Sequence, residues 1–173
     1  MNWKLLATAV MVSAATATPA VAAFIVNPAG ASGSFGWSDG IGPIDNINGT
    51  SETVFSLTAN AGDSVTITLT DCCLIGDQFE LYLDGSQISP TSVSGGVSSP
   101  FAYLFSDVLL AGGENLFQVV VTALAPFPGA LPGGASWSFS AVTPGTAVPE
   151  PAALALFGLG LAGLGMTRRR KAA

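Results

Sequence analysis

Four carboxylates near the middle of the chain could together hold a divalent cation. Asp71, Asp77, Glu80 and Asp84 fall within one short stretch of sequence around an expected turn. Calcium suits such groups, because it takes about six to eight oxygen ligands and tolerates irregular geometry. The D-x-[DN]-x-[DN]-G spacing of an EF-hand is absent, however, and a solvated acidic loop is the alternative. The sequence thus predicts no obligatory cofactor, with calcium as the one candidate.

Glycoside hydrolysis is the reaction that a pair of these carboxylates could perform, since it takes one acid and one base or nucleophile. No known signature surrounds these acids. Histidine is absent and every Lys and Arg lies near an end of the chain, which excludes Ser-His-Asp, Cys-His and Schiff-base chemistry between those ends. We therefore predict a non-enzymatic protein with no catalytic residue, and a secreted glycoside hydrolase is the remotest alternative.

The two cysteines, Cys72 and Cys73, are adjacent. In a strand their side chains would point to opposite faces and could not pair. A disulfide between neighbours requires a distorted turn, because adjacent Cα atoms lie about 3.8 Å apart and a disulfide usually spans at least about 4.4 Å. Three alternatives stay open: a vicinal disulfide, a disulfide to another chain, and buried free thiols. Export to an oxidising compartment disfavours lasting free thiols.

Trp37 and Tyr82 are the aromatic residues that could stack on a sugar ring. Trp37 is flanked by Gly36 and Ser38, which favours an exposed position. Tyr82 lies on the polar side of an alternating segment, whereas Trp137 alternates with other apolar residues and is expected in the core. The sequence therefore offers Trp37 and Tyr82 as a candidate glycan site.

Alternation of apolar and polar residues dominates the region that must position these side chains, and it predicts strands rather than helices. One further segment is apolar on both faces and predicts a central strand. Short spacings with Gly-rich turns favour a single antiparallel β-sandwich, jelly-roll-like, over 23–142, followed by a linker over 143–147. The alternating segments are 54–59, 64–70, 78–84 and 136–141, and the segment apolar on both faces is 116–124.

The distribution of charge is extreme. The chain has a formal net charge of −6, and all five basic residues lie at position 4 or in 168–171. Removing those five positive charges from −6 leaves a central domain near −11. Nucleic acids and anionic lipid surfaces are therefore excluded as partners, because binding to phosphate depends on Lys and Arg.

The C-terminal segment 148–173 has three parts in a fixed order. It begins with Val148-Pro149-Glu150-Pro151, continues with an apolar stretch over 152–167, and ends with Arg168-Arg169-Arg170-Lys171. The uncharged run 152–166 within this stretch predicts a transmembrane helix of about 23 Å, which is short against a hydrocarbon core of about 30 Å. The basic cluster should stop transfer and remain cytoplasmic. A buried core helix is the alternative, but the two prolines separate the segment from the preceding fold.

This order of acidic Pro-Glu-Pro, apolar helix and basic end resembles the PEP-CTERM sorting tail. The resemblance covers only 148–173. It implies recognition by an exosortase, a membrane-embedded cysteine transpeptidase-like enzyme that cuts near the motif. It also implies a Gram-negative host that secretes exopolysaccharide and forms biofilm.

A second resemblance covers Asp71 to Gly85. Asp71, Gly76-Asp77, Phe79 and Glu80 match a strand-turn-strand motif of small secreted bacterial β-sandwich domains. This resemblance implies the fold rather than an activity.

The N-terminus is typical of a secretory signal peptide over 1–22. Lys4 precedes an apolar stretch, and Ala20-Val21-Ala22 forms an A-x-A cleavage site. Cleavage is expected after Ala22, with Ala23 as the alternative. The β-sandwich is thus expected between an N-terminal signal helix and a C-terminal hydrophobic helix.

These observations predict an exported, exosortase-sorted protein of the cell surface or extracellular matrix, with a structural or adhesive role among exopolysaccharides. The alternative is a lectin-like carbohydrate-binding module that could depend on calcium. The expected partners are the secretory translocon, signal peptidase, an exosortase and exopolysaccharide. The inner membrane is a transient partner through the C-terminal helix.

Overall fold

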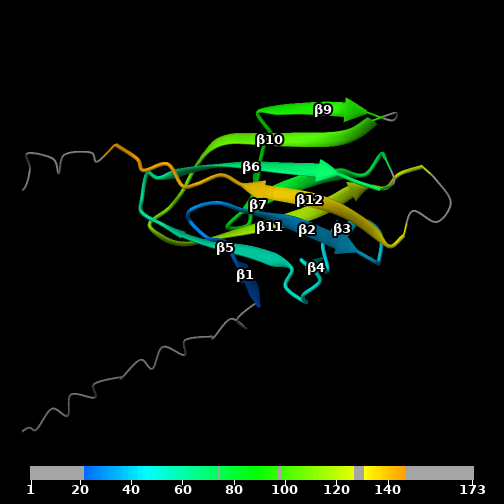
Figure 1. Cartoon of the computed structure of the whole chain (residues 1–173), viewed down its shortest axis with the longest axis horizontal. Coiled ribbons are helices and arrows are strands. Elements are labelled where there is room, and N and C mark those ends of the chain that lie inside the picture. Colours follow the sequence, from blue (N-terminus) through cyan, green and yellow to red (C-terminus); the bar gives the residue numbers. More distant parts are fainter. Residues whose placement is uncertain (1–21, 74, 97–98, 127–130, 147–173) are drawn as a thin grey trace, which may run out of the picture.

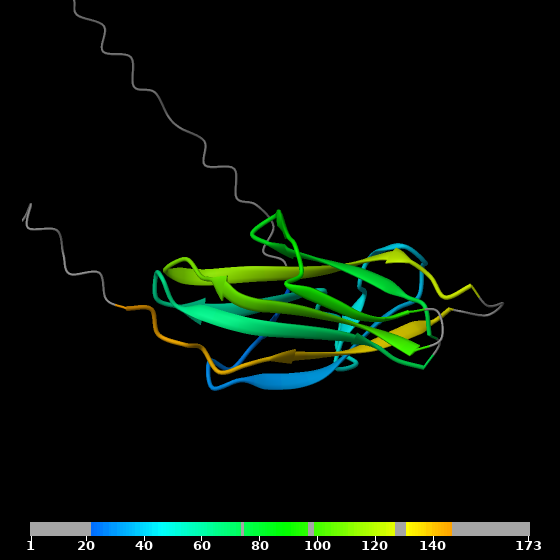
Figure 2. The ribbon, with the colours of Figure 1, turned by 90° about the horizontal axis from the view of Figure 1, so that it is seen from above.

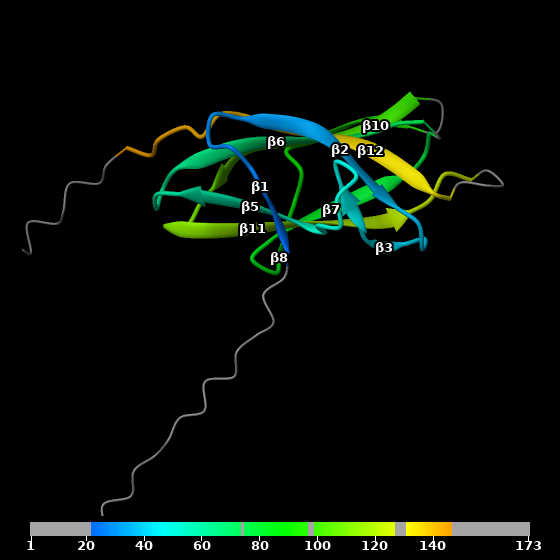
Figure 3. The same cartoon turned by 60° about the horizontal axis from the view of Figure 1, so that its bottom comes forward.

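The computed structural model describes residues 22–73, 75–96, 99–126 and 131–146, and this part of the chain is a sandwich of two β-sheets (Figure 1). The two sheets lie one above the other, with strands running along the long axis of the molecule (Figures 2 and 3). The expectation of an all-β sandwich is confirmed. The expected helices over 1–22 and 152–167 lie almost wholly outside the described residues. Within these residues the structure contains no helix of the length and hydropathy needed to cross a membrane.

The first sheet, here called sheet I, has the strand order β1-β5-β11-β7-β8, and β3 also pairs with β11. Strand β1 runs parallel to β5, whereas the other pairs are antiparallel. The strands are β1 (Ala23–Ile25), β3 (Gly42–Pro43), β5 (Val54–Ala59), β7 (Gln78–Leu83), β8 (Ser86–Ile88) and β11 (Gly113–Ala123).

The second sheet, sheet II, has the order β4-β2-β12-β6-β10-β9, with every pair antiparallel. Strand β9 forms one edge of this sheet (Figure 1). The strands are β2 (Ala31–Trp37), β4 (Asn46–Ile47), β6 (Ser64–Asp71), β9 (Ser92–Gly96), β10 (Ser99–Leu109) and β12 (Gly133–Phe139).

The pairing is nested in the manner of a jelly roll. Strand β2 pairs with β12, β5 with β11, and β6 with β10, so that the two halves of the chain wind together as one long folded ribbon. Successive pairs alternate between the two sheets, which is how a jelly roll closes its core. The jelly-roll expectation is therefore confirmed as well.

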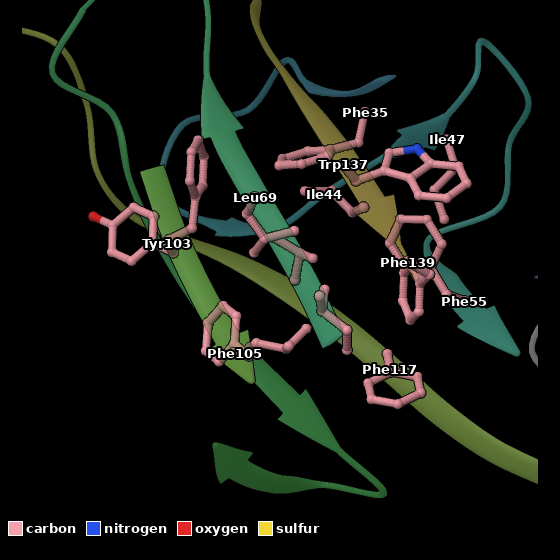
Figure 4. Close-up of a cluster of buried hydrophobic side chains, with 14 of the residues drawn as sticks. Phe35, Ile44, Ile47, Phe55, Leu69, Tyr103, Phe105, Phe117, Trp137 and Phe139 are labelled. Atoms are coloured by element: carbon pink, nitrogen blue, oxygen red, sulfur yellow. The ribbon is translucent and has the colours of Figure 1, made fainter. Parts of the chain in front are cut away.

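The core is aromatic and lies between the sheets (Figure 4). Alternation explains it: β6 buries every second residue from Val65 to Asp71, while Thr66, Thr68 and Thr70 face outward. Trp137 is buried, as expected, and its ring lies 5.0 Å from Phe55 in an edge-to-face arrangement. The largest fully buried side chains include Phe35, Trp37, Phe55, Phe105 and Phe117.

The chain beyond β12 is fastened to the turn between β5 and β6. Thr143 and Ser64 exchange backbone hydrogen bonds, and the Gly145 N–H donates to Asp63 Oδ1 at 3.0 Å. The C-terminal segment therefore leaves the described domain at a defined end of β6, opposite Asp71.

Candidate functional site

Asp71 and Asp77 form a buried carboxyl pair at the end of the sandwich where β6 connects to β7. Each side chain is only 1% exposed. Asp71 Oδ2 accepts hydrogen bonds from the backbone N–H groups of Gly76 at 2.8 Å and Asp77 at 3.2 Å. Asp77 Oδ1 accepts from the Ala125 N–H at 2.7 Å, just beyond β11. The pair thus holds the β6–β7 turn closed and attaches it to the chain that leaves sheet I.

The second oxygen of each carboxyl group is buried as well, namely Asp71 Oδ1 and Asp77 Oδ2. Neither oxygen accepts a hydrogen bond from any donor in the described residues. Burial raises the pKa of Asp71 despite three backbone hydrogen bonds that oppose the shift. Burial also raises the pKa of Asp77, and the neighbouring charge of Asp71 adds to this shift. Both groups therefore hold a proton more firmly than an ordinary aspartate.

The cysteines adjoin this pair but differ in their surroundings. Cys72 is half-buried, and its thiol donates to the Gly134 carbonyl oxygen at 3.0 Å. Burial, followed by the contact with the Cys73 thiol, raises the pKa of Cys72 to about 12. Cys73 is exposed and has a φ of 75°, so the two cysteines occupy a turn rather than a strand. Both thiols are free in this structure.

Glu80 and Asp84 lie elsewhere. Glu80 is on the outer face of sheet I and accepts a hydrogen bond from the Tyr82 hydroxyl at 2.9 Å. Asp84 accepts from the Leu116 N–H at 2.9 Å in the turn between β7 and β8. Nowhere in the described ranges do three His, Cys, Asp or Glu side chains group as metal ligands would. Of the four carboxylates considered for calcium, the structure brings together only the first two.

Tyr82 lies on the outer face of sheet I, as the alternation in its strand predicts. Its cross-strand neighbours are Gln118 on β11 and Gln87 on β8. The hydrogen bond to Glu80 is the main cause of a raised pKa for Tyr82. A partly exposed aromatic ring between two amide side chains is a surface on which a sugar could stack.

Trp37 does not contribute to such a surface, and the prediction of an exposed platform is wrong. It is 2% exposed and lies on the inner face of β2 with Phe35. Its ring meets Phe79 edge-to-face at 5.5 Å. The alternation of Phe35 and Trp37 was the signal for burial, and the adjacent Gly, Ser and Asp obscured it.

Sheet II has an outer face lined by hydroxyl groups, which the sequence reasoning missed. Register places Ser34, Ser136 and Thr70 in one row across three strands, and Ser32, Ser138 and Thr68 in the next. Repeated T-x-T and S-x-S spacings in the sequence could have revealed it. We define the hydroxyl face as Ser32, Ser34, Thr66, Thr68, Thr70, Ser92, Ser94, Ser136 and Ser138, none of which is charged.

The sorting residues 148–151 and 168–171 lie outside the described residues, as does Ala20. Ala22 is described, and it immediately precedes β1. Residues 147–171 match the family model of the PEP-CTERM protein-sorting motif. No curated protein matches the chain, and no solved structure matches it. The chain thus carries a PEP-CTERM sorting segment, which implies an exported, membrane-anchored precursor that an exosortase processes and sorts to the cell surface.

Proposed function

We propose that the mature β-sandwich is a non-enzymatic structural or adhesive component of an exopolysaccharide matrix around a Gram-negative cell. The sorting segment supports delivery to the surface. The hydroxyl face is the observation that carries the role itself. Across β2, β12 and β6 it offers rows of uncharged donors and acceptors about 4.8 Å apart. Ala102 and Leu104 on β10 separate these rows from Ser92 and Ser94 on β9.

The negative charge of the central domain favours a neutral polysaccharide as the partner of this face. The central domain carries only carboxylates as charged side chains, so an acidic polysaccharide would be repelled by most of its surface. None of the residues of the hydroxyl face is charged, and the exposed Asp107 borders it, with its backbone N–H 3.5 Å from Thr66 Oγ1. A neutral polysaccharide can therefore approach it without an electrostatic penalty and exchange hydrogen bonds with water for hydrogen bonds with the protein.

The test compares retention in the matrix for full-length variants in an exopolysaccharide-producing host. Thr68→Lys places a charge at the centre of the hydroxyl face and should release most of the protein into the medium. Gln118→Lys, on the outer face of sheet I, is the matched control and should stay bound. Equal retention of both variants and the wild type would remove the hydroxyl face from the proposal.

A lectin-like module is the second candidate, and Tyr82 favours it. Its ring lies between Gln87 and Gln118, beside Glu80, in an arrangement that could bind one sugar unit. On a glycan array Tyr82→Ala would then abolish binding while Thr68→Lys would not. Repeating the array with EDTA tests a role for calcium. Release of shortened glycans during either experiment would contradict the non-enzymatic proposal.

A further inference from the structure

The Asp71–Asp77 pair joins three segments of chain at one end of the sandwich. Asp71 ends β6, Asp77 precedes β7, and the hydrogen bond from the Ala125 N–H reaches the chain after β11. Three backbone N–H groups are used in these contacts. Only one oxygen of each carboxyl group takes part, so the two remaining oxygens must be satisfied in another way.

Two negative charges cannot be buried side by side without compensation, because desolvation and mutual repulsion both oppose ionisation. None of the described residues is a Lys or Arg, since all five of the sequence lie at position 4 or in 168–171. A calcium ion would require about six to eight oxygen ligands. Two carboxyl groups that are each 1% exposed leave little access for the waters that would complete such a shell.

We propose that Asp71 and Asp77 share one proton at neutral pH. The protonated pair holds the end of β6, the start of β7 and the chain after β11 together, and it does so more strongly at low pH than at high pH. Asp77 carries the proton and donates it from Oδ2 to Asp71 Oδ1. This one hydrogen bond satisfies both remaining oxygens and leaves a single negative charge on the pair. That charge is held by the N–H groups of Gly76 and Asp77.

The other titratable groups around the pair do not supply a positive charge. Cys72 follows Asp71 directly, and its raised pKa of about 12 keeps the thiol neutral. Tyr103 faces Asp71 from β10, and burial is the main cause of its raised pKa. Cys73 is exposed on the same turn. The proton on the pair is therefore the available means of neutralisation.

The sign of the pH dependence follows from the raised pKa values of both groups. The folded protein binds the shared proton more tightly than the unfolded chain does. Its stabilising effect is complete below the ordinary carboxyl pKa of about 4 and is lost as the pH rises through the raised values. Asp45 and Asp63 act oppositely, because their lowered pKa values stabilise the fold above the ordinary carboxyl pKa.

Asp77→Asn provides the test, because its amide can donate permanently where the shared proton donates in the wild type. When the pH is raised from 5 to 8, the melting temperature of the processed wild-type protein recovered from cells should fall. This fall should exceed the change in D77N by about 3 °C or more. At pH 8 the variant should be more stable than the wild type. Asp39→Asn removes an exposed carboxylate and should follow the wild-type profile.

Infrared spectroscopy reads the proton directly. A protonated carboxyl band should be present in the wild type at pH 7 and absent in D77N. Parallel stability profiles of the wild type and D77N, or no such band, would overturn the proposal. A calcium-dependent rise in melting temperature that D77N abolishes would overturn it in favour of a metal. Asp77→Ala should be destabilised at every pH, because it leaves the Ala125 N–H without its acceptor.

Discussion

At the scale of single residues, the two adjacent thiols should differ sharply in reactivity. The thiolate is the reactive form, and Cys72 is held as a thiol by burial and by its hydrogen bond to Gly134. Cys73 is exposed. In reduced protein at pH 8 we expect iodoacetamide to modify Cys73 at least about tenfold faster than Cys72.

Peptide mass spectrometry after brief alkylation measures both rates in one sample. Cys73→Ser is the control, since it should leave only the slow reaction. Comparable rates at the two positions would contradict the assigned environments. Protein recovered from cells without reductant tests the pairing alternatives, because a vicinal disulfide removes both reactive thiols and lowers the mass by two hydrogens.

Prediction from the sequence succeeded for residues whose inward or outward position follows from the alternation within a single strand. Tyr82 and Trp137 were placed correctly by alternation. Of the four carboxylates that the sequence grouped together, only Asp71 and Asp77 meet. They do so through contacts to a turn and to Ala125, a residue far along the chain. Sequence proximity drew Glu80 and Asp84 into the same group, although Glu80 lies on the outer face of sheet I and Asp84 in the turn after β7.

At the scale of elements, two adjacent glycines of β12 differ in the space that an added Cβ would find. A Cβ on Gly133 would overlap the indole of Trp37, its cross-strand partner. A Cβ on Gly134 would lie 3.6 Å from the Phe35 carbonyl oxygen, an ordinary contact. We expect Gly133→Ala to lower the free energy of unfolding by about 1–3 kcal/mol.

Gly134→Ala is the matched control, and it should change the free energy of unfolding by no more than about 0.5 kcal/mol. Urea denaturation followed by tryptophan fluorescence measures both variants, because Trp37 and Trp137 are buried in the core. Equal stability of the two variants would show that the indole can move aside.

Five strands could be read from alternation or continuous hydrophobicity, and each corresponds to a strand of the structure: β5, β6, β7, β11 and β12. Strands β2 and β10 were not recognised. Their outward positions include Gly36, Ala102 and Leu104, which break the alternation. The short strands β1, β3 and β4 owe their existence to pairing partners distant in sequence, which a local pattern cannot reveal.

At the scale of the whole molecule, the segregation of charge predicts an unusual product of processing. Every Lys and Arg lies in the N-terminal or C-terminal segment that export and sorting should remove. We therefore expect the processed protein to contain no trypsin site and to survive prolonged digestion even when it is denatured. An intact-mass measurement should show the loss of both ends.

Unprocessed precursor from cells lacking the exosortase is the control, and trypsin should trim it within 168–171. Material from wild-type cells that still carries Arg168 to Lys171 would contradict cleavage and make the tail a permanent anchor. The sorting motif could be predicted from the sequence because it is a linear pattern of residues.

The hydrogen bonds that join Thr143 and Gly145 to the β5–β6 turn also fix the end of the sandwich at which the C-terminal segment leaves it. A precursor held by its C-terminal segment is tethered at that end, and β6 leads about 23 Å away from it. Asp71 ends β6, so the Asp71–Asp77 pair and the adjacent Cys73 lie about that far from the attachment. The end of the sandwich that bears the buried carboxyl pair and the thiols is thus the one farthest from the point where the sorting segment leaves the domain.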